Sequence, residues 1–281
     1  MVPSTVAVGR SQVFQDVLDA PATLRAYASD VAGYRDWCTK ADLVAFPAEP
    51  QVVGAYIVSA SARYAYATLR RRVAAISRET ALGGAPLNTK HPAIRNTLRG
   101  IGRTHDGRGR RAAPLTTADV RSLISACEKD ICGEPAVRLT GLRDRALLLF
   151  ALAGALRRSE VVGIDVAHIT WDQQGFVALV KKPRGDAIGG TVEIRVAVSQ
   201  NTDPCPVAAL RSWLDLADIH AGPVFRKVAR GGHVQADRLT GAGIWQIVKK
   251  RTAAAGLKPP SSHEYLSPHS LRTGLVTSLP R

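Results

Sequence analysis

Residues 146–161 read ALLLFALAGALRRSEV, and the rest of the chain can be organised around this stretch. Its first eleven residues, Ala146 to Leu156, form the longest apolar run in the sequence. Such a run predicts a buried helix and is too short to cross a bilayer. Two arginines, a serine and a glutamate follow at positions 157–160. The polar groups at the end of this buried helix are the first candidates for chemistry.

The second half of the chain mixes predicted helices with predicted strands. Upstream of the apolar run, Thr116 and Asp119 have the spacing of a capping box, which opens a helix. Downstream, hydrophobic residues alternate over 176–180 and 192–198, which predicts two strands of a small antiparallel sheet, with 168–171 as a candidate third strand. Further helices are predicted over residues 207–216, over 241–255 and after Pro268.

The first hundred residues predict four short helices. Apolar residues recur at steps of three and four from Leu24 to Cys38, which is one face of a helix. The other three helices are predicted around 52–57, around 69–76 and from Pro92 onward.

A basic linker is predicted to separate two domains. The segment 102–113, GRTHDGRGRRAA, has three glycines, four arginines and no apolar periodicity. We therefore expect a helical domain over residues 1–101 and a second domain over 114–281. The expected fold class is mainly α, with a small antiparallel β-sheet in the second domain.

The chain is strongly basic, with 38 lysines and arginines, 23 acidic residues and a net charge of +15. Between Arg63 and Arg111 there are twelve basic and two acidic residues. A surface that serves only solubility has basic and acidic residues interspersed. The excess of basic residues in this segment therefore predicts a polyanionic partner. A solvated helix face with counterions is the alternative. The candidate DNA-binding residues are Arg70, Arg71, Arg72, Arg95, Arg99, Arg103, Arg110 and Arg111.

Several classes of protein are excluded by composition and spacing. The start, MVPSTVAVGR, lacks the charged and apolar blocks of a signal peptide. Four cysteines form no CxxC pair, which argues against a zinc site and a disulfide framework and favours a reducing cytoplasm. A membrane protein, a secreted mini-domain and a zinc finger are therefore excluded. With 46% hydrophobic residues, a cytoplasmic globular protein is expected, associated with the nucleoid if the source is prokaryotic.

Three short segments of the second domain carry the candidate chemistry. They are ALRRSEV at 155–161, VKKPRGD at 180–186 and SPHSLRTG at 267–274. In the last segment Ser267 can cap a helix, and His269 and Arg272 then project from the same face. Taken singly, a helix-end arginine pair, a turn lysine and a first-turn histidine are all common on solvated surfaces.

In this order and around a predicted hairpin, the three segments resemble the tyrosine recombinase (phage integrase) family. LRRSE matches the L-R-x-S-E box of the family, and HSLRTG matches its H-x-L-R-x-G box. AAPLT at 112–116 resembles the opening of the family's catalytic domain. The resemblance implies a helical core-binding domain, an α+β catalytic domain, double-stranded DNA as the partner and a homo-oligomer on that DNA. It implies site-specific strand cleavage and rejoining, as in integration or excision of mobile DNA.

The resemblance also assigns residues. Arg157 and Arg272 would bind the oxygens of the scissile phosphate, because a guanidinium presents a rigid fork to an oxyanion. His269 would donate to the phosphate or move a proton. Lys182 would protonate the leaving 5′ oxygen, and Glu160 would orient Arg157. The family chemistry requires no cofactor or metal, and the sequence shows no acidic ligand cluster.

The nucleophile of the family is a tyrosine well beyond the second arginine. The six tyrosines of this sequence all precede Arg272, and the last of them, Tyr265, stands in a predicted loop before the histidine box. We therefore expect a C-terminally truncated catalytic domain that binds DNA without cleaving it, unless a partner supplies a tyrosine in trans. A non-catalytic DNA-binding regulator on a recombinase scaffold is the alternative. A basic RNA-binding protein fits the charge, but aromatic residues make up only 5% of the chain.

Overall fold

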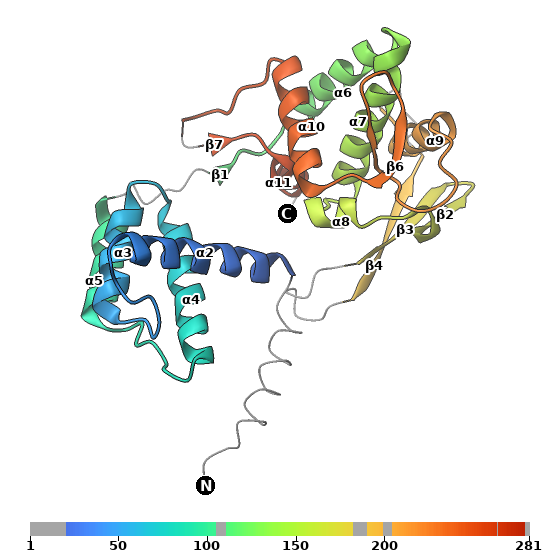
Figure 1. Cartoon of the computed structure of the whole chain (residues 1–281). Coiled ribbons are helices and arrows are strands. Elements are labelled where there is room, and N and C mark those ends of the chain that lie inside the picture. Colours follow the sequence, from blue (N-terminus) through green and yellow to red (C-terminus); the bar gives the residue numbers. More distant parts are fainter. Residues whose placement is uncertain (1–20, 105–110, 182–189, 199–203, 263, 279–281) are drawn as a thin grey trace. The chain divides into compact units, whose positions relative to one another are not determined.

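A computed structural model describes residues 21–104, 111–181, 190–198, 204–262 and 264–278 (Figure 1). The chain divides into two compact units, unit 1 over residues 1–109 and unit 2 over residues 110–281. In the described parts of both units, no helix has the length and apolar character needed to span a membrane.

Unit 1 contains the four helices that the periodicity predicts (Figure 1). They are α2 (Pro21–Lys40), α3 (Pro50–Ser61), α4 (Tyr66–Leu82) and α5 (Pro92–Thr104). Helix α2 packs against α4, and α3 packs against α5. Their apolar faces meet in one core, where Tyr34, Ile57, Leu69, Ile76 and Ile94 are completely buried.

Arg72 belongs to this core and not to the surface of unit 1. Its side chain is only 8% exposed, and its Nε lies 3.5 Å from the buried carboxylate of Asp30. Its Nη1 donates a hydrogen bond to the hydroxyl of Tyr56, and its guanidinium lies 3.9 Å from the centroid of the Tyr64 ring. The prediction that Arg72 contacts DNA is therefore wrong. Its guanidinium is buried and offsets the negative charge of the buried Asp30 carboxylate.

Unit 2 is built around one long buried helix. Its helices are α6 (Thr117–Ile131), α7 (Pro135–Ala153), α8 (Arg158–Val162), α9 (Pro206–Leu216), α10 (Gly241–Ala254) and α11 (Pro268–Ser278). Helix α7 packs against α6, α8, α9 and α11. The first eight residues of the predicted apolar run form the C-terminal part of α7, where Ala146, Leu147 and Phe150 are buried. Its last three residues, 154–156, lie beyond the end of the helix. The capping box predicted at Thr116 and Asp119 is confirmed, and it opens α6.

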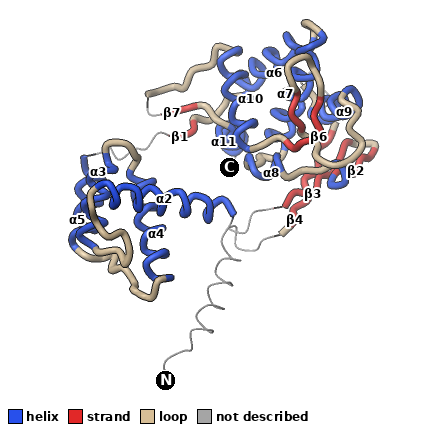
Figure 2. Tube along the Cα trace, in the orientation of Figure 1, coloured by secondary structure: helices blue, strands red, loops and turns tan. Residues whose placement is uncertain are grey.

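The predicted antiparallel sheet is also present (Figure 2). Its three strands, in the order β2-β3-β4, are β2 (Ile169–Asp172), β3 (Gly175–Lys181) and β4 (Thr191–Ala197). Phe176 pairs with Trp171 on one side and with Val196 on the other. Its ring stacks on that of Phe150 with centroids 5.9 Å apart, which fastens the sheet to α7.

Two further strand pairs were not predicted. Strands β5 (Arg226–Val228) and β6 (Val234–Arg238) form an antiparallel hairpin. Strands β1 (Arg111–Ala112) and β7 (Glu264–Tyr265) pair in parallel, so segments from the two ends of unit 2 lie side by side.

Ordered structure extends into the predicted linker from both sides. Helix α5 continues through Thr104, three residues past the predicted domain boundary at 101. Ala113 is fully buried, and its backbone N–H donates to the carbonyl of Tyr265 at 3.0 Å. The N–H of Leu115 donates to the carbonyl of Ser270 at 3.2 Å. The segment that opens unit 2 is thus hydrogen-bonded to the segment that carries the histidine box.

Candidate phosphate-binding site

A tight turn at the end of α7 sets the position of Arg157. The N–H of Ala155 donates to Leu152 at 3.0 Å, and the N–H of Leu156 donates to Ala151 at 2.9 Å. Ala155 has a φ of 45°, a left-handed conformation that costs an L-residue about 1 to 2 kcal/mol. Leu156 is buried beyond it. The chain therefore reverses sharply, and Arg157 stands as the residue that precedes α8.

Glu160 holds Arg157 in place from within the protein. Its Oε2 accepts the backbone N–H of Arg157 at 2.7 Å, and its Oε1 lies 3.3 Å from the Nη1 of the same arginine. The Glu160 side chain is completely buried, whereas the Arg157 side chain is 35% exposed. The predicted contact between the two residues is present, and it leaves part of the guanidinium at the surface.

Arg272 reaches the same turn from α11. Its Nη1 donates to the carbonyl oxygen of Ala155 at 3.2 Å. The predicted cap of this helix is confirmed, since Ser267 Oγ accepts the N–H of His269 at 3.2 Å. His269 is exposed in the first turn of α11. The turn after α7 therefore brings together two arginines that are far apart in the sequence.

The remaining predicted residues are distributed as follows. Lys182 and Arg110 lie outside the described residues, and Lys181 is the exposed last residue of β3. Tyr265 lies in β7, where it pairs with Ala112, and it is 37% exposed. Exposed predicted DNA-binding residues are Arg70, Arg71, Arg95, Arg99, Arg103 and Arg111. Among the residues that the structure describes, acidic neighbours are found for two of these six: the Nε of Arg71 lies 2.8 Å from Asp30, and that of Arg111 lies 3.6 Å from Glu264.

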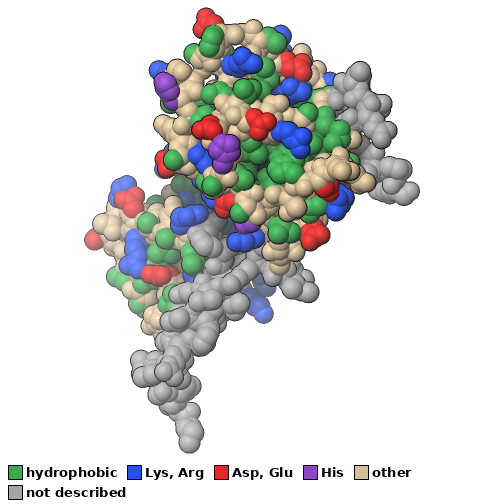
Figure 3. All heavy atoms as spheres, turned by 90° about the vertical axis from the view of Figure 1, so that its right-hand side faces the viewer, with side chains coloured by type: hydrophobic (Ala, Val, Ile, Leu, Met, Phe, Trp, Pro, Cys, Tyr) green, Lys and Arg blue, Asp and Glu red, His purple; other side chains and the backbone are tan. Residues whose placement is uncertain are grey.

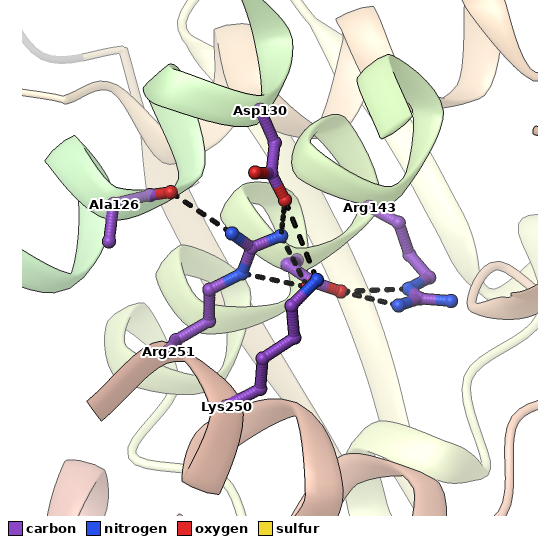
Figure 4. Close-up of polar contacts among 6 residues, drawn as sticks. Ala126, Asp130, Arg143, Lys250 and Arg251 are labelled. Atoms are coloured by element: carbon purple, nitrogen blue, oxygen red, sulfur yellow. Dashed lines mark hydrogen bonds and ion pairs between the residues drawn. The ribbon is translucent and has the colours of Figure 1, made fainter. Parts of the chain in front are cut away.

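A buried ionic cluster joins α6, α7 and α10, and it was not predicted from the sequence (Figure 4). Arg251 of α10 is 1% exposed; its Nη2 lies 2.7 Å from Asp130 of α6, and its Nε donates to Asp144 of α7 at 2.8 Å. Arg143 also pairs with Asp144, at 2.6 Å, and Lys250 lies 3.6 Å from Asp130. Burial opposes the charge of Arg251, but the neighbouring Asp144 leaves its pKa above the ordinary value.

The cluster ties α10 to α7, the helix that leads into the turn before Arg157. Its two acids are far from Arg251 in sequence, so no local spacing predicts the contact. The local signal is the position of Asp144, two residues before the first residue of the apolar run, which is predicted to be a buried helix.

A second missed residue is Arg238 of β6. Its Nη2 donates to Asp165 at 2.6 Å, and its Nη1 donates to the carbonyl oxygen of Val162 at 2.5 Å. It thereby fixes the C-terminal end of α8, the helix that Arg157 precedes.

Two guanidiniums are fixed at one turn, and an exposed histidine stands three residues before the second of them on α11. This arrangement defines a protein that can bind a phosphate ester through charge-assisted hydrogen bonds. Residues 114–281 match the phage integrase family, and the chain belongs to that family.

Curated relatives extend the match to both units. The integrase/recombinase xerD homolog of Selenomonas ruminantium is 32% identical over 262 residues, which cover 92% of this chain and 74% of that protein. The tyrosine recombinase XerC of Corynebacterium glutamicum is 26% identical over 262 residues, which cover 92% of this chain and 72% of that protein.

Solved structures share the fold at lower identity. A XerH site-specific recombinase bound to a palindromic difH substrate matches with a TM-score of 0.58 at 16% identity. The match covers 90% of this chain and 67% of the XerH chain. A lambda integrase dimer bound to a core site matches with a TM-score of 0.57 at 12% identity. The match covers 94% of this chain and 66% of the lambda integrase chain.

Proposed function

We propose that the chain binds double-stranded DNA and holds one phosphodiester in a site of the tyrosine recombinase type, whose family reaction is strand cleavage and rejoining in site-specific recombination. The observation that carries the proposal is the hydrogen bond from Arg272 to Ala155, which places the second arginine at the turn that bears Arg157. Relatives named as an integrase/recombinase xerD homolog and as a tyrosine recombinase support the reaction class. Structures titled as a dimer and a tetramer of lambda integrase on DNA support a homo-oligomer on DNA. The proposed place of action is the cytoplasm, in association with the nucleoid if the source is prokaryotic.

The proposed chemistry follows from the charge that develops on the phosphate. As an incoming hydroxyl oxygen bonds to phosphorus and the bond to the 5′ oxygen breaks, negative charge gathers on the non-bridging oxygens. Arg157 and Arg272 would donate to those oxygens and remain charged at any working pH. His269 would donate to the phosphate or move a proton, and Lys182 would give a proton to the leaving 5′ oxygen.

Glu160 is proposed as a positioning residue. Its buried carboxylate holds both the backbone and the head group of Arg157, so the guanidinium meets the phosphate already oriented. We assign no nucleophile among the residues of this site. Tyr265 is not proposed for that role, because its segment pairs with β1 as part of the fold of unit 2.

The salt dependence of DNA binding tests this function. The double variant R157A/R272A should bind a duplex more weakly than the parent. The slope of log K against log salt should fall by about one in magnitude, since the two arginines hold the same phosphate and each neutralised phosphate contributes about 0.9. The matched control is R211A on α9, where the guanidinium lies 4.8 Å from the centroid of the Trp171 ring. An unchanged slope in the double variant, with the fold intact by circular dichroism, would refute the phosphate site.

A further inference from the structure

Helix α8 needs support from the rest of unit 2 because it is very short. It spans Arg158–Val162, five residues, and follows directly on Arg157 (Figure 1). Helices of fewer than about 12 residues are marginal by themselves in water. The position of Arg157 therefore depends on the contacts that hold the two ends of α8.

The two ends of α8 are held by different side chains. At its start, the buried carboxylate of Glu160 accepts the backbone N–H of Arg157 at 2.7 Å. At its end, the Nη1 of Arg238 donates to the carbonyl oxygen of Val162 at 2.5 Å and to that of Ile164 at 3.3 Å. The final carbonyl groups of a helix have no donor within the helix, so Arg238 supplies one from outside.

Arg238 also binds the segment that leaves α8. Its Nη2 donates to the Oδ1 of Asp165 at 2.6 Å, three residues beyond Val162. The planar, rigid fork of a guanidinium can bind a carboxylate and backbone carbonyl groups at the same time, whereas the ammonium group of a lysine is a single point charge on a flexible stem. Arg238 therefore fixes both the last carbonyl group of α8 and the direction in which the chain leaves the helix.

The β5–β6 hairpin holds Arg238 in turn. Arg238 is the last residue of β6, and the next residue, Leu239, is buried. The N–H of Leu239 donates to the carbonyl oxygen of Phe225 at 2.8 Å, and the N–H of Val224 donates to that of Ile164 at 3.2 Å. The hairpin and the residues beside it thus hold the end of α8 against the core of unit 2.

Hydrogen bonds within α8 connect its end to its start. The carbonyl oxygen of Arg157 accepts the N–H of Glu160 at 2.9 Å and that of Val161 at 3.1 Å. From Arg157 to Val162 the helix rises by only about 7.5 Å, at about 1.5 Å per residue. A displacement of the end of α8 therefore also changes the direction of the Arg157 guanidinium.

We propose that Arg238 is a positioning residue of the phosphate site, which orients Arg157 and does not itself contact the phosphate. The inference rests on the proposed function, because the phosphate is placed by Arg157 and Arg272. Asp165 shares this role, since its carboxylate holds the Nη2 of Arg238. Loss of Arg238 should therefore weaken phosphate binding only while Arg157 is present.

A double-mutant cycle on the full chain tests the proposal. Binding to a random-sequence duplex of about 30 base pairs is measured for the parent, R238M, R157A and R157A/R238M at one salt concentration, because the affinity depends on salt. R238M keeps a long side chain but removes the donors. Losing the partner that orients a metal ligand costs about 10- to 100-fold, and we expect a loss of about tenfold for R238M. In the R157A background R238M should have no further effect, because residues that act through one contact are not additive.

Two results would overturn the proposal. Additive losses in the double variant would mean that Arg238 contacts the DNA independently of Arg157. Equal binding by R238M and the parent would mean that Arg157 needs no support from Arg238. If R238M does not fold by circular dichroism, D165N replaces it in the cycle, since it leaves the donors of Arg238 in place and should weaken binding by a smaller factor. Failure of the parent to bind the duplex would instead refute the proposed function.

The matched control is R195M on the three-stranded sheet. The Nη1 of Arg195 lies 2.7 Å from Asp172 of β2, so this variant also removes an arginine from a close ion pair. The side of unit 2 around α9 and β2 shows basic and acidic side chains interspersed (Figure 3). We expect R195M to bind the duplex like the parent. A loss equal to that of R238M would attribute both effects to net charge and overturn the positioning role.

Discussion

The Oε2 atom of Glu160 accepts the backbone N–H of Arg157 at 2.7 Å, from a side chain that is completely buried. One carboxylate therefore joins the start of α8 to the arginine that is proposed to hold a phosphate. Removing the acceptor leaves a backbone donor without its partner and an arginine without its support.

We expect E160A to lower the free energy of unfolding by about 1 to 3 kcal/mol, the usual cost of losing a buried charged hydrogen-bond partner. E160Q should recover part of this loss, since its amide oxygen can still accept the N–H of Arg157. Urea unfolding followed by circular dichroism measures both variants. Equal stability of E160A and the parent would show that the contact contributes nothing.

Disrupting the buried cluster around Arg251 should lower the free energy of unfolding by more than E160A does. D144N removes the charge that Arg251 and Arg143 share, and breaking a buried ion pair costs about 3 to 5 kcal/mol. The matched control is D36N, which disrupts the exposed pair of Asp36 and Lys40 and should cost less than about 1 kcal/mol. Similar unfolding midpoints for the two variants would contradict the structural importance of the cluster.

Arg70 and Arg72 are two residues apart and should behave in opposite ways. R72A should destabilise unit 1, because the buried Asp30 loses a partner. R70A should leave stability within about 0.5 kcal/mol, since its side chain is exposed. If Arg70 contacts a phosphate, R70A should also lower the salt slope of DNA binding by about one. A destabilised R70A would contradict this division between surface and core.

Cys127 predicts a decrease in stability at alkaline pH. Burial raises the pKa of its thiol to about 12, above the value of about 8.5 in an unfolded chain. The folded state therefore favours the protonated thiol, so this contribution to stability is complete below about pH 8.5 and is lost as the pH rises toward 12. Stability curves from pH 8 to 11 should be flatter for C127A than for the parent. C132A, which removes an exposed thiol, should follow the parent curve; parallel curves for all three proteins would exclude the effect.

The elements that the sequence predicts correctly are those with a local signal. Helical periodicity predicts the four helices in the described part of unit 1, and alternation predicts the three-stranded sheet. The β1–β7 and β5–β6 pairs are only two to five residues long, and their partners are chosen by tertiary contacts that no local pattern carries.

The wrong prediction that Arg72 lies on the DNA-binding surface has a different origin, because the sequence does contain the pattern that indicates its burial. Leu69, Val73 and Ile76 define the buried face of α4, and Arg72 stands on that face at helical spacing. A run of three arginines suggested a single basic surface, but successive residues of a helix point about 100° apart. The periodicity of the neighbouring apolar residues was the better guide. The pairing of Glu160 with Arg157 was predictable from helical spacing in the same way, since Glu160 stands three positions after Arg157, within one turn.

The pairing of β1 with β7 has a consequence for how unit 2 folds. The first strand of the unit has its partner near the opposite end of the unit, so the pair closes a long loop, and contacts of high sequence separation form slowly. During synthesis, Arg111 and Ala112 leave the ribosome well before Glu264 and Tyr265 exist. The segment that brings Arg272 to the turn before Arg157 arrives at the same late stage. We therefore expect the two arginines of the phosphate site to come together only after the segment that carries Arg272 has been synthesised.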